Sequence, residues 1–507
     1  MSAGSTLAML ATKCAARVFD LSSDLRNVSI RDQVVRAQLL VRELLQEPEC
    51  QRVLVVGAGV SGVTAAVALA AAKREVLVVE TNAAPLSLQG ACDWRYVGPF
   101  MYEWPSHFFD DQAYPPSGTG WPAPPPSTPQ WPGPALSARP PLDPLTAADL
   151  AAHLGAWLKR QAPAPAVLCG VDPDAVQDYV KDFVAYWEAQ HLSPATSPPR
   201  PALNVQRLGG SLWCGTRPAL DDIEIDYVVL AAGMGNENTT LNDRWGKPAF
   251  TARRFWLDRD DLREPTTADQ QVAVLGGGDG ALQDVLRALT HFDHPLQMWH
   301  FLRSGRGIAA SPDYPTWQAD KTRQALDDLL PELAAIEQQH RLVAMWDPTR
   351  DSARAQVVDQ ACEALAQRAA RQPDVEAGVL ASLRSGTGCV THLMREQHFG
   401  KAYLLNRFLV HLIEACQGPN VRHLGRMSYR LLRGCDVAWA QEHHGPTQFE
   451  ISYQLPGHAA TSAFFDQVAV RFGVSGVPAR QLVTLSKDDE AWRTSLSGLQ
   501  LPFVVPD

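Results

Sequence analysis

Three glycines early in the chain have the spacing of a phosphate-binding turn. Gly57, Gly59 and Gly62 directly follow the apolar run Val53–Val56. In such a pattern the first glycine permits a tight strand-to-helix turn, the second lets the backbone approach a pyrophosphate, and the third lets the helix pack closely on the strand. Gly-rich turns are common, so the meaning of this one depends on the elements around it.

The strand, helix, second strand and acidic residue that accompany a dinucleotide-binding turn are expected around these glycines, in that order. Val53–Val56 reads as a buried parallel strand, residues 63–72 as a helix, and Glu75–Val79 as a second strand that ends in Glu80. Glu80 lies 23 residues after Gly57 (80 − 57), where a carboxylate can accept hydrogen bonds from both hydroxyls of a ribose. The helix start would face the phosphates with free amides and the positive end of its dipole. The residues assigned to this nucleotide are Gly57, Gly59, Val60, Ser61, Gly62 and Glu80.

A second unit of the same kind is expected from Val272 onward. Val272–Leu275 reads as a strand, residues 281–289 as a helix, and Leu296–Leu302 as a second strand followed by Arg303 and Arg306. Because a 2′-phosphate needs cations at the end of that strand, the two arginines favour NADPH over NADH. The acidic residue in the turn either faces the phosphates or hydrogen-bonds backbone amides instead. The turn residues assigned to the second nucleotide are Gly276, Gly278, Asp279, Gly280 and Ala281.

A buried strand ending in Ala231-Ala232-Gly233 lies between the two turns. It resembles the strand that closes the FAD sheet in the two-dinucleotide-binding-domain flavoproteins, with Ala232 in place of a threonine. The block Gly276–Ala281 resembles the NAD(P)H turn of thioredoxin-reductase-like and flavin-monooxygenase-like members of that superfamily. The resemblance covers residues 51–310. It implies FAD at the first turn and NAD(P)H at the second, and it adds Gly233 to the cofactor-binding residues.

An aromatic-rich segment follows Glu80 and contains Trp94 and Arg95. In a flavoprotein of this kind the segment passes near the isoalloxazine, so that Trp94 would help to wall the ring and Arg95 would offset the charge of the reduced flavin. The alternative is that the aromatic residues only pack under a long loop. The prolines of the Pro-rich loop 115–144 are incompatible with a helix or a central strand. The loop is expected to be a lid or to be partly mobile.

Three features depart from the reductases of this superfamily. The chain has no CxxC pair, so electron transfer through a redox cysteine pair is not expected. It also has no clear Gly-Asp motif for the ribityl chain of the flavin, and Phe465–Gly473 reads as a divergent return strand of the FAD sheet. The helical pattern of residues 318–384 is too long for a minimal reductase, so this stretch either shapes access for a substrate or binds a partner.

Composition and charge exclude several other classes. A net charge of −10 argues against a nucleic-acid-binding surface. No apolar run approaches the ~20 residues of a membrane helix, and the first residues lack a basic signal region. The nine cysteines are scattered, so we expect reduced thiols in a cytoplasmic protein. His392 and His398 lack metal-ligand spacing, and no metal is expected.

The sequence therefore predicts an α/β protein with a Rossmann-like FAD-binding domain, interrupted by a second Rossmann-like NAD(P)H-binding unit, with an additional helical insertion. The expected parts are an N-terminal helical segment at 1–50, the FAD-binding domain at 51–245, the NAD(P)H-binding unit at 246–310, the helical insertion at 311–400, and a C-terminal part at 401–507 that returns to the FAD domain.

The expected function is an FAD-dependent oxidoreductase that is reduced by NADPH, in the form of a flavin monooxygenase acting on a small molecule. No catalytic side chain is assigned, because the cofactor carries the chemistry. One alternative is a flavin oxidase or dehydrogenase whose second nucleotide site is vestigial. Another is a nucleotide-binding sensor or scaffold that uses the helical insertion to bind a protein partner or a second copy.

Overall fold

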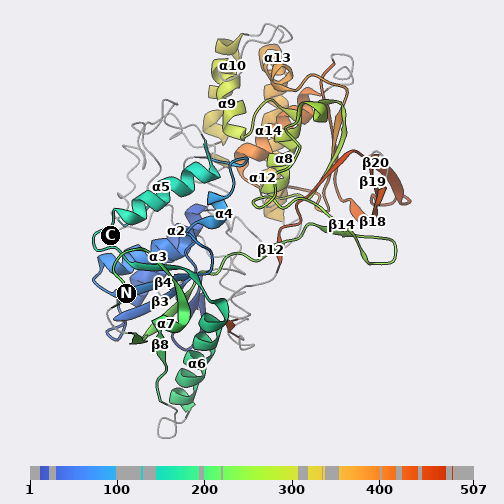
Figure 1. The fold of residues 1–507 in the computed structure, drawn as a ribbon. Coiled ribbons are helices and arrows are strands. Elements are labelled where there is room, and N and C mark those ends of the chain that lie inside the picture. Colours follow the sequence, from blue (N-terminus) through green and yellow to red (C-terminus); the bar gives the residue numbers. More distant parts are fainter. Residues whose placement is uncertain are drawn as a thin grey trace.

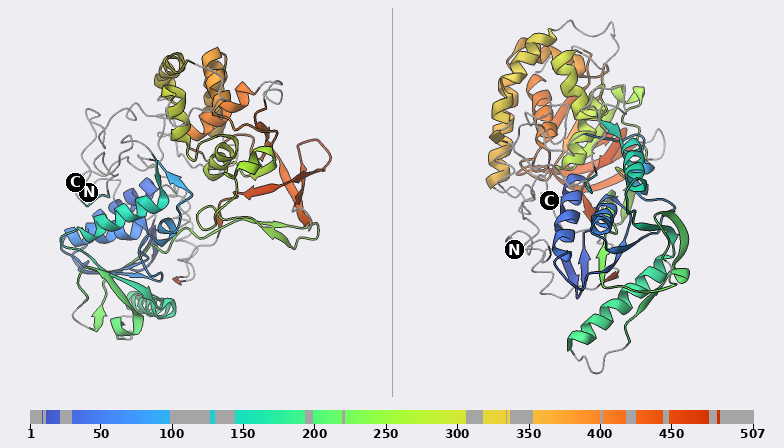
Figure 2. Two further views of the ribbon diagram at one scale, coloured as in Figure 1. Left: turned by 45° about the horizontal axis from the view of Figure 1, so that its top comes forward. Right: turned by 90° about the vertical axis from the view of Figure 1, so that its left-hand side faces the viewer.

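The computed structural model contains two α/β units, one coloured blue to green and the other yellow to red in Figure 1. The left view of Figure 2 shows the two units side by side with connecting segments between them. The structure describes residues 9, 12–21, 30–98, 127–129, 144–192, 199–218, 221–305, 318–333, 335–336, 353–399, 402–417, 425–443, 448–475 and 482–483.

The first unit is built on a seven-stranded sheet with five parallel strands in its centre and an antiparallel strand at each edge. Its continuous apolar strands are buried on both faces, as a parallel sheet between two helix layers requires. In β3, for example, Val53 and Val55 face one core, whereas Leu54 and Val56 face the other. The strand order is β1 (Lys13–Ala15), β2 (Val18–Asp20), β11 (Tyr227–Leu230), β3 (Arg52–Val56), β4 (Glu75–Glu80), β7 (Ala166–Val171) and β9 (Gly209–Cys214).

Helices cover both faces of this sheet. One face packs against α2 (Ile30–Leu44), α3 (Val60–Ala71) and α5 (Ala147–Lys159). The other packs against α6 (Pro173–Leu192) and α7 (Val205–Leu208). Thr146 caps α5, because its hydroxyl accepts a hydrogen bond from the Asp149 amide at 3.0 Å. Smaller elements of the unit are α4 (Ser87–Gly90), the pair β5 (Tyr96–Val97) and β6 (Leu145–Thr146), and the pair β8 (Ala202–Asn204) and β10 (Asp222–Glu224).

The second unit has a four-stranded parallel sheet of order β17-β16-β15-β21. Its strands are β15 (Gln271–Leu275), β16 (Cys389–Leu393), β17 (Ser428–Leu432) and β21 (Gln467–Val470). On one face lie η5 (Pro265–Asp269), α8 (Asp279–Leu289), α9 (Pro295–Ser304), α10 (Ala319–Asp327), α12 (Ala353–Ala370), α13 (Pro373–Ser382) and α14 (Leu404–Cys416). The other face packs against an antiparallel sheet of β18 (Asp436–His443), β19 (Gln448–Gln454) and β20 (Thr461–Phe465).

Among the described residues, two chain segments connect the units. The chain leaves the first unit through β12 (Asn236–Glu237) and comes back through β22 (Val474–Ser475), and these two short strands pair antiparallel. A hairpin of β13 (Thr240–Asn242) and β14 (Pro248–Thr251) follows β12. Near the C-terminus, Val483 is buried in the core of the first unit. No described helix is long and apolar enough to cross a membrane.

Two expectations about the second half of the chain are wrong. Within Phe465–Gly473, β21 pairs with β15 of the second sheet, so it is not a return strand of the FAD sheet. The strands β16 and β17 also belong to the second sheet, so that unit extends far beyond residue 310 and takes in much of 401–507. The physical reason is that an apolar run specifies a buried strand, whereas its neighbour in the sheet depends on contacts between distant residues. The described part of 311–400 contains the helices α10, α12 and α13 before β16.

Candidate functional site

The first Gly-rich turn has the backbone geometry that its spacing predicts. Gly57 has a φ of +103°, and a Cβ there would lie 2.3 Å from the carbonyl oxygen of Ala231. A Cβ on Gly62 would lie 2.0 Å from the carbonyl oxygen of Gly57, so only a glycine lets α3 pack on the turn. Gly59 differs, because no described atom lies within 4 Å of its Cβ position. The turn therefore leaves open space where the pattern places a pyrophosphate.

The start of α3 presents free donors to the same space. Gly59 is the N-cap residue, and no described side chain caps the helix. The amides of the first helical turn, which contains Val60 and Ser61, thus lack intrahelical partners and favour an anion.

Glu80 stands beside the turn at the end of β4. Its Oε2 accepts a hydrogen bond from the Ala58 amide at 2.8 Å, and its Oε1 accepts one from the Asn82 amide at 2.9 Å. Oε1 also accepts from the Asn82 side-chain amide at 2.7 Å and from the Thr81 hydroxyl at 3.4 Å. These bonds hold the carboxylate against the turn and leave a lone pair on Oε2 for a ribose hydroxyl. The turn, the helix start and Glu80 fit the adenosine diphosphate half of FAD.

The residues expected around the flavin ring are described only in part. Trp94 is half-buried against the core of the first unit. Its indole Nε1 is buried and has no hydrogen-bond partner among the described residues, so an oxygen of a ligand would satisfy it. The aromatic residues from Phe100 to Phe109 and most of the Pro-rich loop lie outside the described residues, and the flavin wall stays a prediction.

The second turn repeats the backbone pattern of the first. Gly276 has a φ of +128°, and its amide donates to the Leu393 carbonyl at 2.9 Å. In the first unit the Gly57 amide donates to the Val79 carbonyl at 2.8 Å. A Cβ on Gly276 would lie 2.2 Å from the carbonyl oxygen of Arg471, so glycine is required here too.

The strand beside each turn also ends in the same way. Ala231 follows β11 and precedes Gly233, which has a φ of +97°. Arg471 follows β21 and precedes Gly473, which has a φ of +82°. In each unit the backbone of the residue after the strand lies against the first glycine of the turn. Gly233 itself has no described atom within 4 Å of its Cβ position, and it leads toward β12.

Asp279 at the second turn caps a neighbouring helix. It is the first residue of α8, after the N-cap residue Gly278. Its carboxylate accepts hydrogen bonds from the Tyr403 amide at 3.2 Å and from the Asn406 side chain, at the start of α14. The alternative that Asp279 hydrogen-bonds backbone amides is therefore the one that the structure supports. Burial raises the pKa of Asp279 to about 6, and these hydrogen bonds oppose the shift only in part.

The other turn residues pack tightly. Ala281, in the position of the third glycine, is fully buried. A Cβ on Gly280 would lie 3.5 Å from the ring of Phe255, which is an ordinary contact distance. Phe255 comes from the segment before β15 and brings an aromatic ring to the second turn.

Glu396 is a site residue that the spacing could not reveal. Leu393, the partner of Gly276, ends β16, and Glu396 follows three residues later. Its Oε2 lies 3.0 Å from the Cβ position of Gly277. In the first unit the carboxylate of Glu80 likewise lies against the second residue of the turn. The helical insertion separates the two strands of the second unit in sequence, so only the sheet pairing identifies Glu396.

The expected second strand at Leu296–Leu302 is wrong. Helix α9 spans Pro295–Ser304, with a capping box formed by His294 and Gln297 and with proline in its first turn. Those signals were present in the sequence and outweigh the apolar pattern. Arg303 is therefore not at the end of a second strand; its Nη2 pairs with Asp327 Oδ1 at 2.9 Å. Arg306 lies outside the described residues.

His392 hydrogen-bonds the backbone of the second turn. It is fully buried on β16, and burial lowers its pKa to about 4, so the imidazole is neutral. Nε2 lies 2.6 Å from the Gly276 carbonyl oxygen, which can only accept, so Nε2 carries the proton. Nδ1 then accepts from the Tyr429 hydroxyl at 2.9 Å. The pair holds the carbonyl of the first glycine in place.

The second unit is expected to lose stability between pH 6.5 and 4.5. Burial lowers the pKa of His291 and His392 to about 4 and that of His294 to about 3, so all three bind protons only on unfolding. Asp279 acts with the opposite sign, because its raised pKa makes the folded state the better proton binder. Near pH 5 the three histidines bind about three more protons in the unfolded state, and Asp279 binds about one fewer. The net uptake of about two protons on unfolding changes the free energy of unfolding by about 2.7 kcal/mol per pH unit.

Denaturant titrations at a series of pH values measure this slope. Asp279→Asn should steepen it by about one proton, because the opposing group is removed. A flat profile between pH 4.5 and 6.5 would contradict the assignment of three histidines that are neutral in the folded state.

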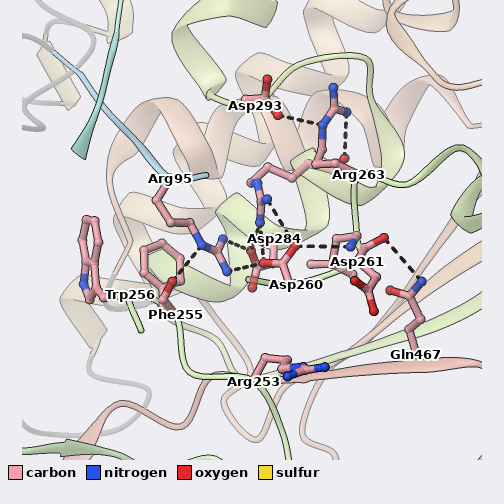
Figure 3. Close-up of polar contacts among 12 residues, drawn as sticks. Arg95, Arg253, Phe255, Trp256, Asp260, Asp261, Arg263, Asp284, Asp293 and Gln467 are labelled. Atoms are coloured by element: carbon pink, nitrogen blue, oxygen red, sulfur yellow. Dashed lines mark hydrogen bonds and ion pairs between the residues drawn. The ribbon is translucent and has the colours of Figure 1, made fainter. Parts of the chain in front are cut away.

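Arg95 is not placed at an open ligand site. Its side chain is 1% exposed and pairs with Asp260 at 2.6 Å and with Asp284 of α8 (Figure 3). Its Nε donates to the Phe255 carbonyl at 2.9 Å, and its guanidinium lies 3.9 Å from the centre of the Phe255 ring. Two further arginines, Arg287 and Arg471, pair with the same carboxylates. The expectation that Arg95 faces the flavin is wrong, because its donors are engaged by carboxylates of the second unit.

The nine cysteines are free thiols, eight of them buried and Cys214 half-buried. Burial raises the pKa of Cys169 and Cys416 to about 12 and that of Cys50, Cys214 and Cys435 to about 11. These thiols therefore stay protonated and unreactive. Among the residues described, no group of three or more His, Cys, Asp or Glu side chains could hold a metal ion.

Comparison with known proteins supports the fold class that the two turns define. A family model described as an NAD(P)-binding Rossmann-like domain matches residues 55–117, which include the first turn, α3 and Glu80. No curated protein matches the chain. The match and the two parallel sheets confirm the expected α/β fold with two Rossmann-like units.

Solved structures of reductases and of a monooxygenase are similar to the chain. Thioredoxin reductase from Lactococcus lactis has 10% sequence identity and a TM-score of 0.33, over 84% of this chain and 78% of that one. Bacillithiol disulfide reductase from Staphylococcus aureus has 11% sequence identity and a TM-score of 0.35, and the match covers 86% of this chain and 80% of that one. Cyclohexanone monooxygenase has 11% sequence identity and a TM-score of 0.35, and the match covers 85% of this chain and 76% of that one. These are the two kinds of protein that the motifs resemble; at such scores the likeness carries no conclusion about activity.

Proposed function

We propose that this protein is an FAD-dependent oxidoreductase that is reduced by a nicotinamide dinucleotide. The observation that carries the proposal is the repetition of one turn geometry in two parallel sheets. Each turn has a first glycine with positive φ held between two strand ends, and a carboxylate against its second residue. Folding alone does not require the same turn geometry in both sheets, whereas binding of two dinucleotides does.

The first unit supplies the flavin site and the second the nicotinamide site. Gly59, the start of α3 and Glu80 would hold the adenosine diphosphate of FAD. When bound, a flavin takes a hydride from a reduced nicotinamide and passes the electrons to a second acceptor. In the second unit, Gly278 and the start of α8 would hold the pyrophosphate, and Glu396 would face the ribose. His392 and Tyr429 keep that turn in shape.

The thiols favour oxygenation of a small molecule over disulfide reduction as the second half-reaction. A disulfide reductase of this superfamily needs an accessible pair of cysteines. Here no CxxC exists, eight of the nine thiols are buried, and burial raises the pKa of Cys169 and Cys416 to about 12. We therefore keep flavin monooxygenase as the specific proposal, with a small molecule as substrate.

A second candidate function rests on the acidic character of the second turn. Glu396 lies against Gly277, and Asp279 opens α8. Two carboxylates beside the turn oppose a pyrophosphate electrostatically. If they prevent binding, the protein is a flavin oxidase or dehydrogenase that its organic substrate reduces directly.

Anaerobic reduction of the flavin-loaded protein separates the two candidates. Purified protein is saturated with FAD, and NADH or NADPH is added without oxygen while the visible spectrum is recorded. Bleaching of the flavin bands supports the proposal. A flavin that stays oxidised with both dinucleotides favours the oxidase, and a protein that takes up no FAD contradicts both candidates.

The choice between NADH and NADPH is expected to depend on Glu396. Arg303 cannot reach a 2′-phosphate in this role, since it pairs with Asp327 on the insertion. A carboxylate near the ribose suits the 2′-hydroxyl of NADH and repels the 2′-phosphate of NADPH. Glu396→Gln should therefore raise the affinity for NADPH relative to NADH by about tenfold, which is about 1.4 kcal/mol.

Dissociation constants of both dinucleotides for the parent and the variant measure this ratio. Glu442→Gln on β18 is a control that removes a carboxylate of the same unit away from the turn. An unchanged ratio in Glu396→Gln would show that the ribose binds elsewhere.

A further inference from the structure

Five buried charged groups lie where the two units meet. Arg95 comes from the first unit and pairs with Asp260 and Asp284 (Figure 3). These two aspartates, Arg287 and Arg471 come from the second unit and the segment before it. All five side chains are at most 6% exposed. Burial by itself would raise the pKa of Asp284, but Arg95, Arg471 and Arg287 together hold it well below the usual value. Asp284 is therefore ionised, and the contact between the units is made by ion pairs.

The backbone around Arg95 belongs firmly to the first unit. Its carbonyl accepts a hydrogen bond from the Ala147 amide at 2.8 Å, at the start of α5. The next two residues form β5, which pairs with β6. Gly98, just after β5, lies so close to the second unit that a Cβ would be 3.0 Å from the His294 ring. Arg95 thus reaches from a fixed segment of one unit onto α8 of the other.

The chain itself connects the units by a narrow ribbon. Apart from segments outside the described residues, the crossings are β12 and β22, which pair over two residues each. Glu237 on β12 accepts hydrogen bonds from the Phe255 and Trp256 amides, which ties the ribbon to the same region. A two-stranded ribbon can bend and twist, so it does not by itself fix one orientation.

The charges of the cluster show that Arg95 is not needed to neutralise it. Three arginines and two aspartates leave one positive charge in excess. Without Arg95, Arg287 still pairs with Asp260 at 2.9 Å and Arg471 with Asp284 at 2.7 Å. The second unit would keep balanced charges, so the contribution of Arg95 lies in the contact across the units.

We propose that Arg95 is a positioning residue that fixes the second unit, through α8, in one orientation on the first. This inference rests on the proposed function for its consequence: α8 begins at the nicotinamide turn, so Arg95 sets how that turn faces the flavin. Hydride transfer depends steeply on such placement, and misplacement by about 1 Å can cost about a hundredfold in rate.

Arg95→Met tests the proposal in the full chain. It removes the charge but keeps much of the side-chain length. Spin labels at Lys181→Cys on α6 and Gln360→Cys on α12, both exposed positions, report the distance between the units. A Cys214→Ser background leaves only buried native thiols. The parent should give one narrow distance distribution, and Arg95→Met a clearly broader one.

The rate of flavin reduction gives a second readout. At saturating dinucleotide, Arg95→Met should reduce flavin at least about tenfold more slowly. The dissociation constants for FAD and the dinucleotide should stay unchanged, because Arg95 contacts neither turn. Arg95→Lys keeps the positive charge but lacks the planar guanidinium, so its distance distribution and its rate of flavin reduction should lie between those of the parent and of Arg95→Met. It replaces Arg95→Met in the test if that variant does not fold.

Arg207→Met is the matched control, since Arg207 forms an exposed ion pair with Asp178 within the first unit. It should leave both readouts at parent values. An Arg95 variant with a narrow, parental distance distribution would overturn the proposal. Distances are measured without cofactor, so a parent whose flavin is not reduced would contradict the proposed function without affecting this test.

Discussion

Gly57→Ala is expected to abolish flavin binding and to destabilise the first unit by about 3 kcal/mol. The φ of +103° strains any residue with a Cβ, and that Cβ would lie 2.3 Å from the Ala231 carbonyl oxygen. Both the turn and the end of β11 would have to move. Chemical denaturation gives the loss of stability, and a flavin titration gives the loss of binding.

Gly59→Ala separates ligand binding from folding at the same turn. Its φ of −71° suits alanine, and no described atom lies within 4 Å of the new Cβ. Stability should therefore change little, whereas the methyl group would occupy the space assigned to the pyrophosphate. Loss of a charged hydrogen bond there would weaken FAD binding by about 1.5–3 kcal/mol, or about tenfold to a hundredfold. Unchanged FAD affinity would place the phosphates elsewhere.

Asp284→Asn is expected to cost about 3–5 kcal/mol of stability, because it leaves three buried arginines with one carboxylate. Asp284 is fully buried and pairs with Arg95, Arg287 and Arg471. Its lowered pKa means that its contribution is present above the unfolded value near 3.8 and is lost as pH falls below it. The variant should therefore also depend less on pH in strong acid.

Asp258→Asn is the matched control for this change. Asp258 pairs with Arg254 in a partly exposed position, and its pKa is lowered to about 2, chiefly by its hydrogen bond with that arginine. Water screens such a pair, so its removal should cost at most about 1 kcal/mol. Equal losses in the two variants, measured by denaturant unfolding, would contradict the special role of the buried cluster.

Local sequence was sufficient to predict both turns. In the first unit, strand, turn, helix, second strand and acid occupy 30 consecutive residues, from Gln51 to Glu80. Each element is encoded by its own apolar periodicity, and the glycines are required by contacts with atoms next to the turn. The helices α2, α5 and α6 were also predictable, because each carries an amphipathic pattern and α5 has a clear N-cap residue.

Prediction failed where an apolar run had more than one possible partner. Leu296–Leu302 and Phe465–Gly473 both read as strands next to nucleotide turns. The first is helical because of its capping residues, and the second joins β15 instead of the first sheet. Pairing of parallel strands is non-local, since a crossover of any length can separate the partners.

By itself, then, the sequence determined the two glycine-rich turns, the class of fold and the absence of a CxxC pair. These follow from short-range rules, because the sterics of glycine and the periodicity of apolar residues act within a few residues. The tertiary structure alone decided that Glu396 stands at the second turn, that Asp279 caps α14, and that Arg95 joins the two units. Each of these contacts links residues more than a hundred positions apart, and their chemistry is set by burial and by partners that spacing along the chain does not reveal.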